Sequence, residues 1–309
     1  MIDISNTWKK DYAELLFPID TNEIKESEAF EIKSQNLPLL YKYRDCSPNN
    51  LENLKNDVVR LSTANSFNDP YDCGLTHNLL HPLKSMLLHA FIDKYAVGKN
   101  ITEEEITKLK NMTLETAIER ILGKEKFNEI KDELSEYLED EIESIEYREI
   151  KNKVELFQQG SLVSCFSENM SSILMWSHYA DNHKGFCIEY DFSKHSLTES
   201  LHPVIYSDKI FDISPYIIDR NRFSNPSVNI YAAINKSKSW SYEQEWRLVF
   251  QGTTPHNYAV PRAKSIFLGS KISNDDKQKL LKIANQNNIS VYQMKIHPRE
   301  YKLIPEQIK

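Results

Sequence analysis

Two carboxylates separated by one residue, Glu243 and Glu245, are candidates for acid–base chemistry. In an extended segment, residues two apart lie on the same face, so both acids can serve one site. A shared face makes paired roles in general acid and base chemistry possible. The alternative is structural, because Glu245 and Arg247 share the same alternation and can form an ion pair at a sheet edge.

Arg44 ends an apolar segment in which Tyr41 and Tyr43 can hold its guanidinium. Its forked donors suit a phosphate or a ribose. A structural alternative is a buried salt bridge from Arg44 to Asp69 or Asp72. These two acids belong to a segment whose Asn, Asp and Pro residues are typical of a turn.

The cysteines and histidines give weaker signals. The four cysteines form no C-x-x-C pair, so we expect free thiols, and His77 and His81 lack an H-E-x-x-H context, so no zinc site is predicted and no metal ligand is assigned. Cys165 could pair with His178 or His183 as nucleophile and base, but its apolar neighbours favour a cysteine of the core.

Strands on both sides of a helical region must position these residues. We expect strands at 39–44, 58–63, 161–166, 185–190, 204–206, 246–250, 265–269 and 289–294. We expect short helices at 5–16, 51–55, 172–180 and 275–285. The sequence thus predicts the α+β class, with a split, bent mixed β-sheet and an inserted helical module.

The domain organisation follows from the same patterns. Residues 1–36 are interpreted as an N-terminal arm and 37–309 as a single α+β domain, in which 263–309 form a βαβ-like C-terminal part. Helical periodicity over 78–159, with a capping box at Thr102 and Glu105, predicts the insertion. Its acidic face is a solvated surface or a docking site for a protein partner, and comprises Glu133, Glu136, Glu139, Asp140, Glu143 and Glu146.

Composition narrows the function classes. The 309 residues carry a net charge of -7, which disfavours nonspecific binding of nucleic acid through a diffuse positive field. The 7 glycines form neither a G-x-G-x-x-G motif nor a P-loop, so Rossmann and Walker sites are not indicated. The start of the sequence and the lack of a long apolar run lead us to expect a cytoplasmic protein without a membrane segment.

Several segments, taken in order, resemble a bacterial and phage family known mainly as a domain of unknown function. The resemblance spans about 39–269 without the helical insertion, and it implies relatives rather than a chemistry. The segments are Leu40–Arg44 (LYKYR), Phe67–Asp72 (FNDPYD), Cys165–Ser167 (CFS), Met175–Ala180 (MWSHYA) with Gly185, and Trp240–Arg247 (WSYEQEWR).

A second resemblance, to ADP-ribosyltransferases of the arginine, serine, glutamate type, supplies a chemical hypothesis. Those enzymes place an Arg on a first strand, a Ser-Thr pair on the next and an E-x-E motif near a later strand. Arg44, Ser62 with Thr63, and Glu243 with Glu245 occur here in that order. Ala64 stands at the last position of their Ser-Thr-Ser, and the helical insertion lengthens the segment that follows.

The resemblance implies NAD as a substrate and assigns a role to each residue. Glu245 would stabilise an oxocarbenium-like transition state, and Glu243 would orient or deprotonate the acceptor. Arg44 would hold a phosphate or ribose of the cofactor, and Ser62, with Thr63 beside it, would order the nicotinamide-side pocket. Tyr71 or Trp176 could stack on nicotinamide or adenine.

The expected function is therefore transfer of ADP-ribose to a protein or nucleic acid, or hydrolysis of NAD, in a toxin or an anti-phage effector. Two other classes remain open. One is a metal-dependent nuclease or phosphodiesterase, whose metal would be held by acids drawn from Asp69, Asp72, Glu189, Asp191, Glu243 and Glu245. The other is a non-catalytic nucleotide-sensing or interaction module.

Overall fold

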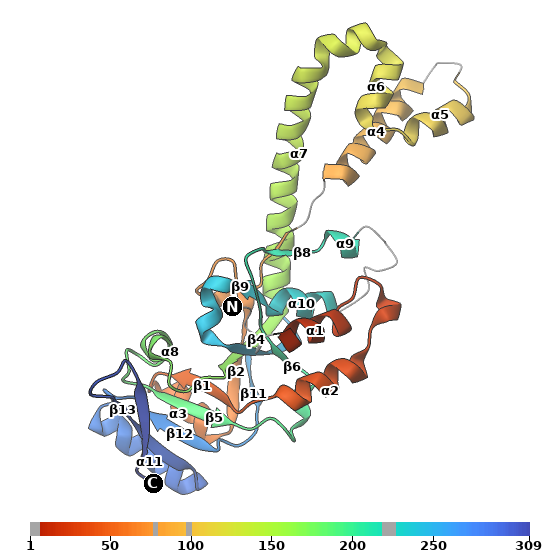
Figure 1. The fold of residues 1–309 in the computed structure, drawn as a ribbon. Coiled ribbons are helices and arrows are strands. Elements are labelled where there is room, and N and C mark those ends of the chain that lie inside the picture. The colour runs from red at the N-terminus through yellow and green to blue at the C-terminus, as the bar shows by residue number, and fades with distance from the viewer. Residues whose placement is uncertain (1–6, 77–79, 97–100, 218–226) are drawn as a thin grey trace. The chain divides into compact units, whose positions relative to one another are not determined.

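The computed structural model describes residues 7–76, 80–96, 101–217 and 227–309, which belong to two compact units. The first unit comprises Met1–Gly74, Glu155–Phe211 and Asp219–Lys309, and the second comprises Leu75–Val154 and Asp212–Ile218. Figure 1 shows a sheet with flanking helices in the first unit and helices in the second. The protein is thus mixed α/β and has an open mixed sheet.

One mixed sheet organises the first unit. Its strands run in the order β11-β2-β4-β1-β5-β12-β13-β14, and β10 joins β6 to β4. The pair β12–β13 is parallel, and the other pairs described in this sheet are antiparallel. The strands are β1 (Leu40–Arg44), β2 (Val58–Thr63), β4 (Ser161–Ser167), β5 (Phe186–Tyr190), β6 (Leu201–Pro203), β10 (Glu245–Gln251), β11 (His256–Ala259), β12 (Ser265–Leu268), β13 (Ser290–Ile296) and β14 (Leu303–Gln307).

The sheet splits at β4. Strand β10 pairs with one edge of β4 along the whole of Ser161–Ser167. On the other edge, β2 pairs with Leu162 and Val163, whereas β1 pairs only with Ser167. Among the described strands, none pairs with residues 164–166 on that edge. Strands β1 and β2 therefore diverge from each other, and the split leaves room beside the middle of β4.

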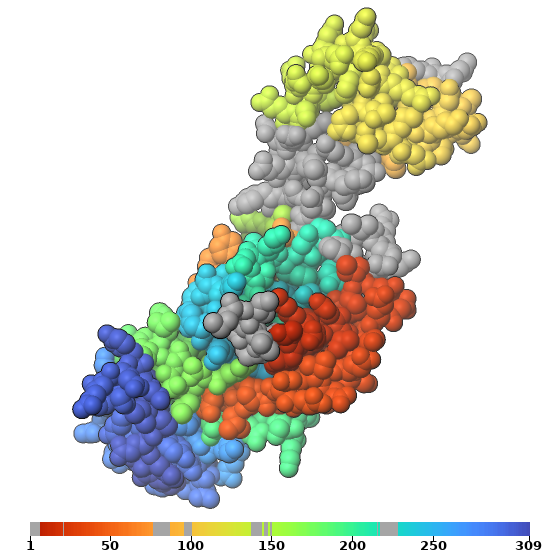
Figure 2. Space-filling model, viewed as in Figure 1, coloured from red at the N-terminus to blue at the C-terminus, as the bar shows by residue number. Residues whose placement is uncertain are grey.

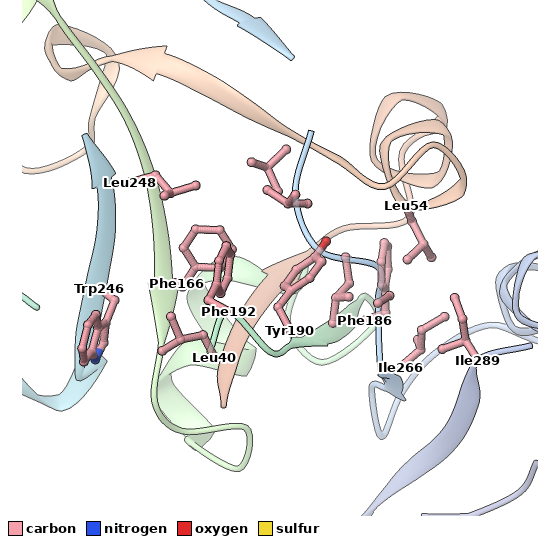
Figure 3. Close-up of a cluster of buried hydrophobic side chains, with 14 of the residues drawn as sticks. Leu40, Leu54, Phe166, Phe186, Tyr190, Phe192, Trp246, Leu248, Ile266 and Ile289 are labelled. Atoms are coloured by element: carbon pink, nitrogen blue, oxygen red, sulfur yellow. The ribbon is translucent and has the colours of Figure 1, made fainter. Parts of the chain in front are cut away.

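Large apolar side chains fill the space behind the split. The ring of Phe166 on β4 lies 5.2 Å from that of Phe192 and 5.8 Å from that of Tyr190, both in edge-to-face geometry. Figure 3 shows these rings close to Leu40 of β1 and Leu248 of β10. Because such interiors are close-packed, this cluster holds the divergent strands in place.

The C-terminal part is a parallel crossover. Helix α11 (Asn274–Asn287) connects β12 to β13. The Ser273 side chain caps its first turn by accepting from the Asp276 amide, and Asn288 ends it in the left-handed conformation. Leu280 and Ala284 are completely buried, because the helix covers one face of the sheet.

Residues 7–36, predicted as an N-terminal arm, form α1 (Thr7–Leu16) and α2 (Glu26–Asn36). They contribute Tyr12, Ala13 and Phe17 to a buried cluster, and the Lys33 ammonium donates to buried backbone carbonyls near β6. Figure 2 shows this red segment packed against the rest of the first unit. The N-terminal helices are thus an integral layer of that unit.

The helical region consists of α4 (Leu80–Ala96), α5 (Glu103–Lys110), α6 (Leu114–Leu122) and α7 (Lys124–Gly160). The predicted capping box at Thr102 and Glu105 is confirmed. Of the acidic face, the Glu133 and Glu136 side chains are exposed, and the other four lie outside the described side chains. No helix within the described ranges has the length and apolar character needed to cross a membrane.

The remaining elements are short. They are η2 (Thr21–Glu23), α3 (Pro48–Lys55), η3 (Ala64–Ser66), β3 (Leu75–Thr76), α8 (Ile173–Tyr179), η4 (Ser196–Thr198), β7 (Ile205–Ser207), β8 (Phe211–Asp212), α9 (Ser214–Ile217), α10 (Ser227–Ile234), β9 (Asn235–Ser237) and η5 (Lys238–Glu243). Strands β7 and β9 form a parallel pair. The helix η5 follows β9 directly and ends at Glu243, the first of the two acids predicted for the site.

The close approach at Gly185 gives a test of this packing. A Cβ atom there would lie 2.1 Å from the Arg44 carbonyl oxygen, so the end of β1 must shift. We predict that Gly185→Ala lowers the free energy of unfolding by about 1–3 kcal/mol, measured by urea denaturation. Gly160→Ala is the matched control, because a Cβ there meets nothing within 4 Å. Equal stability of the two variants would contradict this packing.

Candidate functional site

A cavity of about 210 Å³ lies in the split of the sheet. Residues of β1, β2 and β4 form its walls, and side chains that precede or begin β10 contribute to it as well. It is lined by Tyr41, Lys42, Tyr43, Arg44, Arg60, Ser62, Phe67, Asn68, Asp72, Val163, Ser164, Cys165, Phe166, Ser167, Met175, Tyr179, Lys236, Glu243 and Glu245. All of these residues belong to the first unit.

Four residues singled out from the sequence line this cavity together. Arg44 comes from β1, Ser62 from β2, Glu243 from the end of η5 and Glu245 from the start of β10. Gln244, between the two acids, adopts a left-handed conformation with φ of 46°. The chain therefore turns between the acids, and both carboxylates reach the same cavity although they do not lie on one regular strand.

Three other predicted residues lie elsewhere. Trp176 is completely buried: its ring packs edge-on against Tyr43 at 5.3 Å, and its indole N–H donates to the Met170 carbonyl. Tyr71 is 66% exposed and borders a different hollow. Thr63 follows Ser62 on β2, so its side chain points to the opposite face. Neither Trp176 nor Tyr71 is placed to stack on a ligand in the cavity.

A buried guanidinium organises the acids beneath the cavity. Arg247 of β10 has no exposed surface. Its Nη1 and Nη2 atoms donate to the Asp72 carboxylate at 2.7 and 2.9 Å, and its Nε and Nη2 atoms donate to Glu245 at 2.9 and 3.0 Å. Nη1 also donates to the Ala233 carbonyl at 2.6 Å. The ion pair of Glu245 with Arg247, considered above as the structural alternative, does form, but it is buried and β10 is paired on both sides, so it does not lie at a sheet edge.

A second buried cation, Lys236 of β9, lies among three carboxylates. Its Nζ atom is 2.5 Å from Glu243, 2.9 Å from Glu245 and 3.5 Å from Asp72. The Tyr179 hydroxyl donates to the other oxygen of Glu243 at 2.6 Å. Each acid of the pair is thus hydrogen-bonded, which offsets the cost of burying its charge.

The surroundings separate the two acids in pKa. Burial raises the pKa of Glu243 despite the nearby Lys236 ammonium. Burial also acts to raise the pKa of Glu245. The charges of Arg247 and Lys236 outweigh this effect and lower that pKa to about 2. Glu245 is therefore a permanent negative charge at neutral pH, and Glu243 is the group better suited to exchange a proton.

Arg44 makes no salt bridge to Asp69 or Asp72, so the structural alternative for it is wrong. Asp72 pairs with Arg247 instead, and Asp69 accepts from the Tyr71 amide. The hydrogen bond found for the Arg44 guanidinium is a long one of 3.3 Å to the Tyr43 carbonyl. Within the described residues the Arg44 guanidinium makes no ion pair, and the residue lines the cavity.

The acids proposed for a metal site do not gather as a set. Asp72, Glu243 and Glu245 line the cavity, but the Lys236 ammonium occupies the position between them. Glu189 of β5 accepts from the hydroxyl of Tyr41 on β1, and Asp191 accepts from the Ser193 hydroxyl. Within the described part of the chain, no group of three or more His, Cys, Asp or Glu residues could hold a metal ion.

The structure also disfavours Cys165 as a nucleophile with His178 or His183 as its base. Cys46, Cys73, Cys165 and Cys187 are free cysteines. Cys165 lines the cavity, but burial and the charge of Glu245 raise the pKa of its thiol well above the usual value. His183 bonds to the Ser177 hydroxyl, and His178 is exposed. A protonated thiol is a poor nucleophile.

Sequence reasoning missed Lys42, Tyr179 and Lys236 as functional candidates. Lys42 lies two residues before Arg44, so strand alternation could have identified it. Tyr179 belongs to the Met175–Ala180 segment described above, but Trp176 was the residue of that segment that we predicted to bind the cofactor. Lys236 has no comparable signal, because it lies in a short polar strand whose place depends on a distant pairing.

Comparison with known protein families gives a match to the part of the chain that contributes Tyr179, Lys236, Glu243 and Glu245 to the site. A family model described as a protein of unknown function (DUF2971) matches residues 175–248. The matched segment contains Tyr179, Lys236, Glu243, Glu245 and Arg247, and it supports a resemblance to a family of unknown function. No curated protein and no solved structure matches the chain.

The buried network gives a prediction for stability. Arg247→Met leaves the carboxylates of Asp72 and Glu245 without their guanidinium partner, so we expect a loss of about 3–5 kcal/mol in the free energy of unfolding. Chemical denaturation measures this loss. Arg299→Met is the control and should change stability little, because the Arg299 side chain is exposed and forms no ion pair among the described residues. A loss below about 1 kcal/mol for Arg247→Met would show that the network contributes little.

Proposed function

We propose that this protein is an NAD-consuming enzyme of the ADP-ribosyltransferase type, which transfers ADP-ribose to an acceptor or hydrolyses NAD. One observation carries the proposal. Arg44, Ser62, Glu243 and Glu245, which lie far apart in the sequence, line one cavity. The split of the sheet at β4 supports a likeness to the split sheet of those enzymes.

The proposed reaction begins at the bond between nicotinamide and the C1′ atom of ribose. This bond breaks with its electron pair leaving on nicotinamide, and positive charge develops on the sugar. A fixed anion near the ribose stabilises that charge more in the transition state than in the bound substrate. Glu245 suits this task because two buried cations keep it ionised.

Glu243 would act on the acceptor. Its raised pKa and its place at the cavity suit a general base that takes the proton from an attacking group as the new bond to C1′ forms. Water as the attacking group gives ADP-ribose, and a macromolecular acceptor gives an ADP-ribosylated product. The Tyr179 hydroxyl and the Lys236 ammonium orient the Glu243 carboxylate for either reaction.

The size of the cavity restricts what it encloses. Pockets that surround a drug-sized ligand hold roughly 300–1,000 Å³. A cavity of about 210 Å³ is smaller, so in the proposal it encloses the ribose and one neighbouring group of the dinucleotide. The adenosine half would lie toward the opening, where Arg60 and Asn68 are exposed.

A second candidate is a nucleotide-sensing module without turnover. Arg247 and Lys236 already donate hydrogen bonds to both carboxylate oxygens of Glu245, and this observation favours the sensing module. A carboxylate so engaged can serve as a fixed charge, but it has little capacity left to bond the substrate. Tight binding of NAD without release of nicotinamide would support this candidate.

The two candidates make opposite predictions for turnover. We expect the purified protein, alone or with cell lysate, to release nicotinamide from NAD, measured by mass spectrometry. Glu245→Gln should slow the release about 100-fold or more, because it removes the stabilising charge.

Glu189→Gln is the matched control. Glu189 is also buried and hydrogen-bonded, but it does not line the cavity. Thermal unfolding of both variants shows whether they fold. A folded Glu245→Gln variant that releases nicotinamide at the native rate would reject the role assigned to Glu245.

A further inference from the structure

The two strands that diverge at the split place cationic side chains on the cavity. Lys42 and Arg44 are two residues apart on β1 and share one face of that strand, and Arg60 and Ser62 likewise share one face of β2. The registers Tyr41–Ser167 and Ser62–Val163 place these two pairs on opposite faces of the sheet, so they approach the split from its two sides. All four line the cavity. Among the cavity-lining residues of β1 and β2, none is acidic. The split is thus bordered by three cations and a hydroxyl.

These cations are not neutralised by the acids of the cavity. Asp72, Glu243 and Glu245 pair with Lys236 and Arg247. In the part of the chain that the structure describes, Lys42, Arg44 and Arg60 make no ion pair with a carboxylate. The acidic part of the cavity thus has two cations for its three carboxylates, whereas the three cations of β1 and β2 have no carboxylate partner among the described residues.

Lys42 is a buried ammonium that has no carboxylate partner among the described residues, an unfavourable state for a charged group. It is 4% exposed, and its ammonium donates to neutral groups, the Ser164 hydroxyl at 2.8 Å and the Cys165 carbonyl at 2.7 Å. Both groups belong to the stretch of β4 beside the split. Burial and the charge of Arg44 lower the pKa of Lys42 well below its usual value. A bound anion would relieve both effects, because it supplies the missing countercharge.

We propose that the split between β1 and β2 is a subsite for the diphosphate of a nucleotide, in which Lys42, Arg44 and Arg60 supply the charge. The Ser62 and Ser164 hydroxyls lie where they can donate to further phosphate oxygens. Lys42 is buried and Arg60 is exposed, so the cations extend from the buried part of the cavity to its solvent-facing part. This inference rests on the proposed function only in naming NAD as the source of the diphosphate.

Inorganic pyrophosphate tests the subsite without any turnover. We expect calorimetry to detect its binding to the native protein, and binding should weaken as salt increases. Arg60→Gln and Lys42→Met should each weaken it about tenfold, since each removes a charge-assisted hydrogen bond. Arg299→Gln, at an exposed arginine that does not line the cavity, is the control. ADP should likewise bind more tightly than adenosine.

The outcomes separate this inference from the proposed function. Failure of the native protein to bind pyrophosphate, or equal binding by folded Arg60→Gln, Lys42→Met and Arg299→Gln, would overturn the subsite. Pyrophosphate binding that is lost in these two cavity variants supports the subsite even if NAD is not consumed. Consumption of NAD that is insensitive to both cavity substitutions would support the enzyme and reject the subsite.

Discussion

The guanidinium of Arg247 is completely buried, and its charge must be met by partners from other parts of the chain. Asp72 reaches it from the turn after β2, Glu245 from its own strand, and the Ala233 carbonyl from the end of α10. Removal of the guanidinium leaves the Asp72 and Glu245 carboxylates without a shared buried cation. This constraint draws segments up to 175 residues apart to one point and places the acids beside the cavity.

The cavity itself results from the way the sheet is paired. One edge of β4 is fully used by β10, while the other is divided between β2 and β1. Backbone groups left beside the split need partners, and the Lys42 ammonium serves the Cys165 carbonyl. The same geometry separates the charges, with paired acids near β10 and unpaired cations on β1 and β2. A dinucleotide carries the complementary pattern: an anionic diphosphate next to a ribose that becomes positive during cleavage.

Local patterns predicted much of the fold. Strands β1, β2, β4, β5, β10, β12 and β13 contain several apolar residues each, many of them β-branched or aromatic, and each was predicted within a few residues of its bounds. Short polar elements such as β9 and the strands β6, β11 and β14 were missed. Their pairing depends on distant segments, and an isolated stretch of three to five residues carries little periodicity.

The site was predicted in part for related reasons. Arg44, Ser62, Glu243 and Glu245 were chosen by residue type and order, and the structure brings them to one cavity. Trp176 was chosen because aromatics often stack on ligands, but the residue type does not reveal that its ring is buried. The role of Lys236 could not be deduced from its neighbours in the sequence, since its three carboxylate contacts arise only in the folded chain.

A crystal structure of the Glu245→Gln variant with NAD would show directly where the dinucleotide binds. We expect the ribose beside residues 243 and 245 and the diphosphate between β1 and β2, within hydrogen-bond distance of Lys42 and Arg44. NAD bound outside the split, or a cavity that remains free of ligand at saturating NAD, would contradict this proposal.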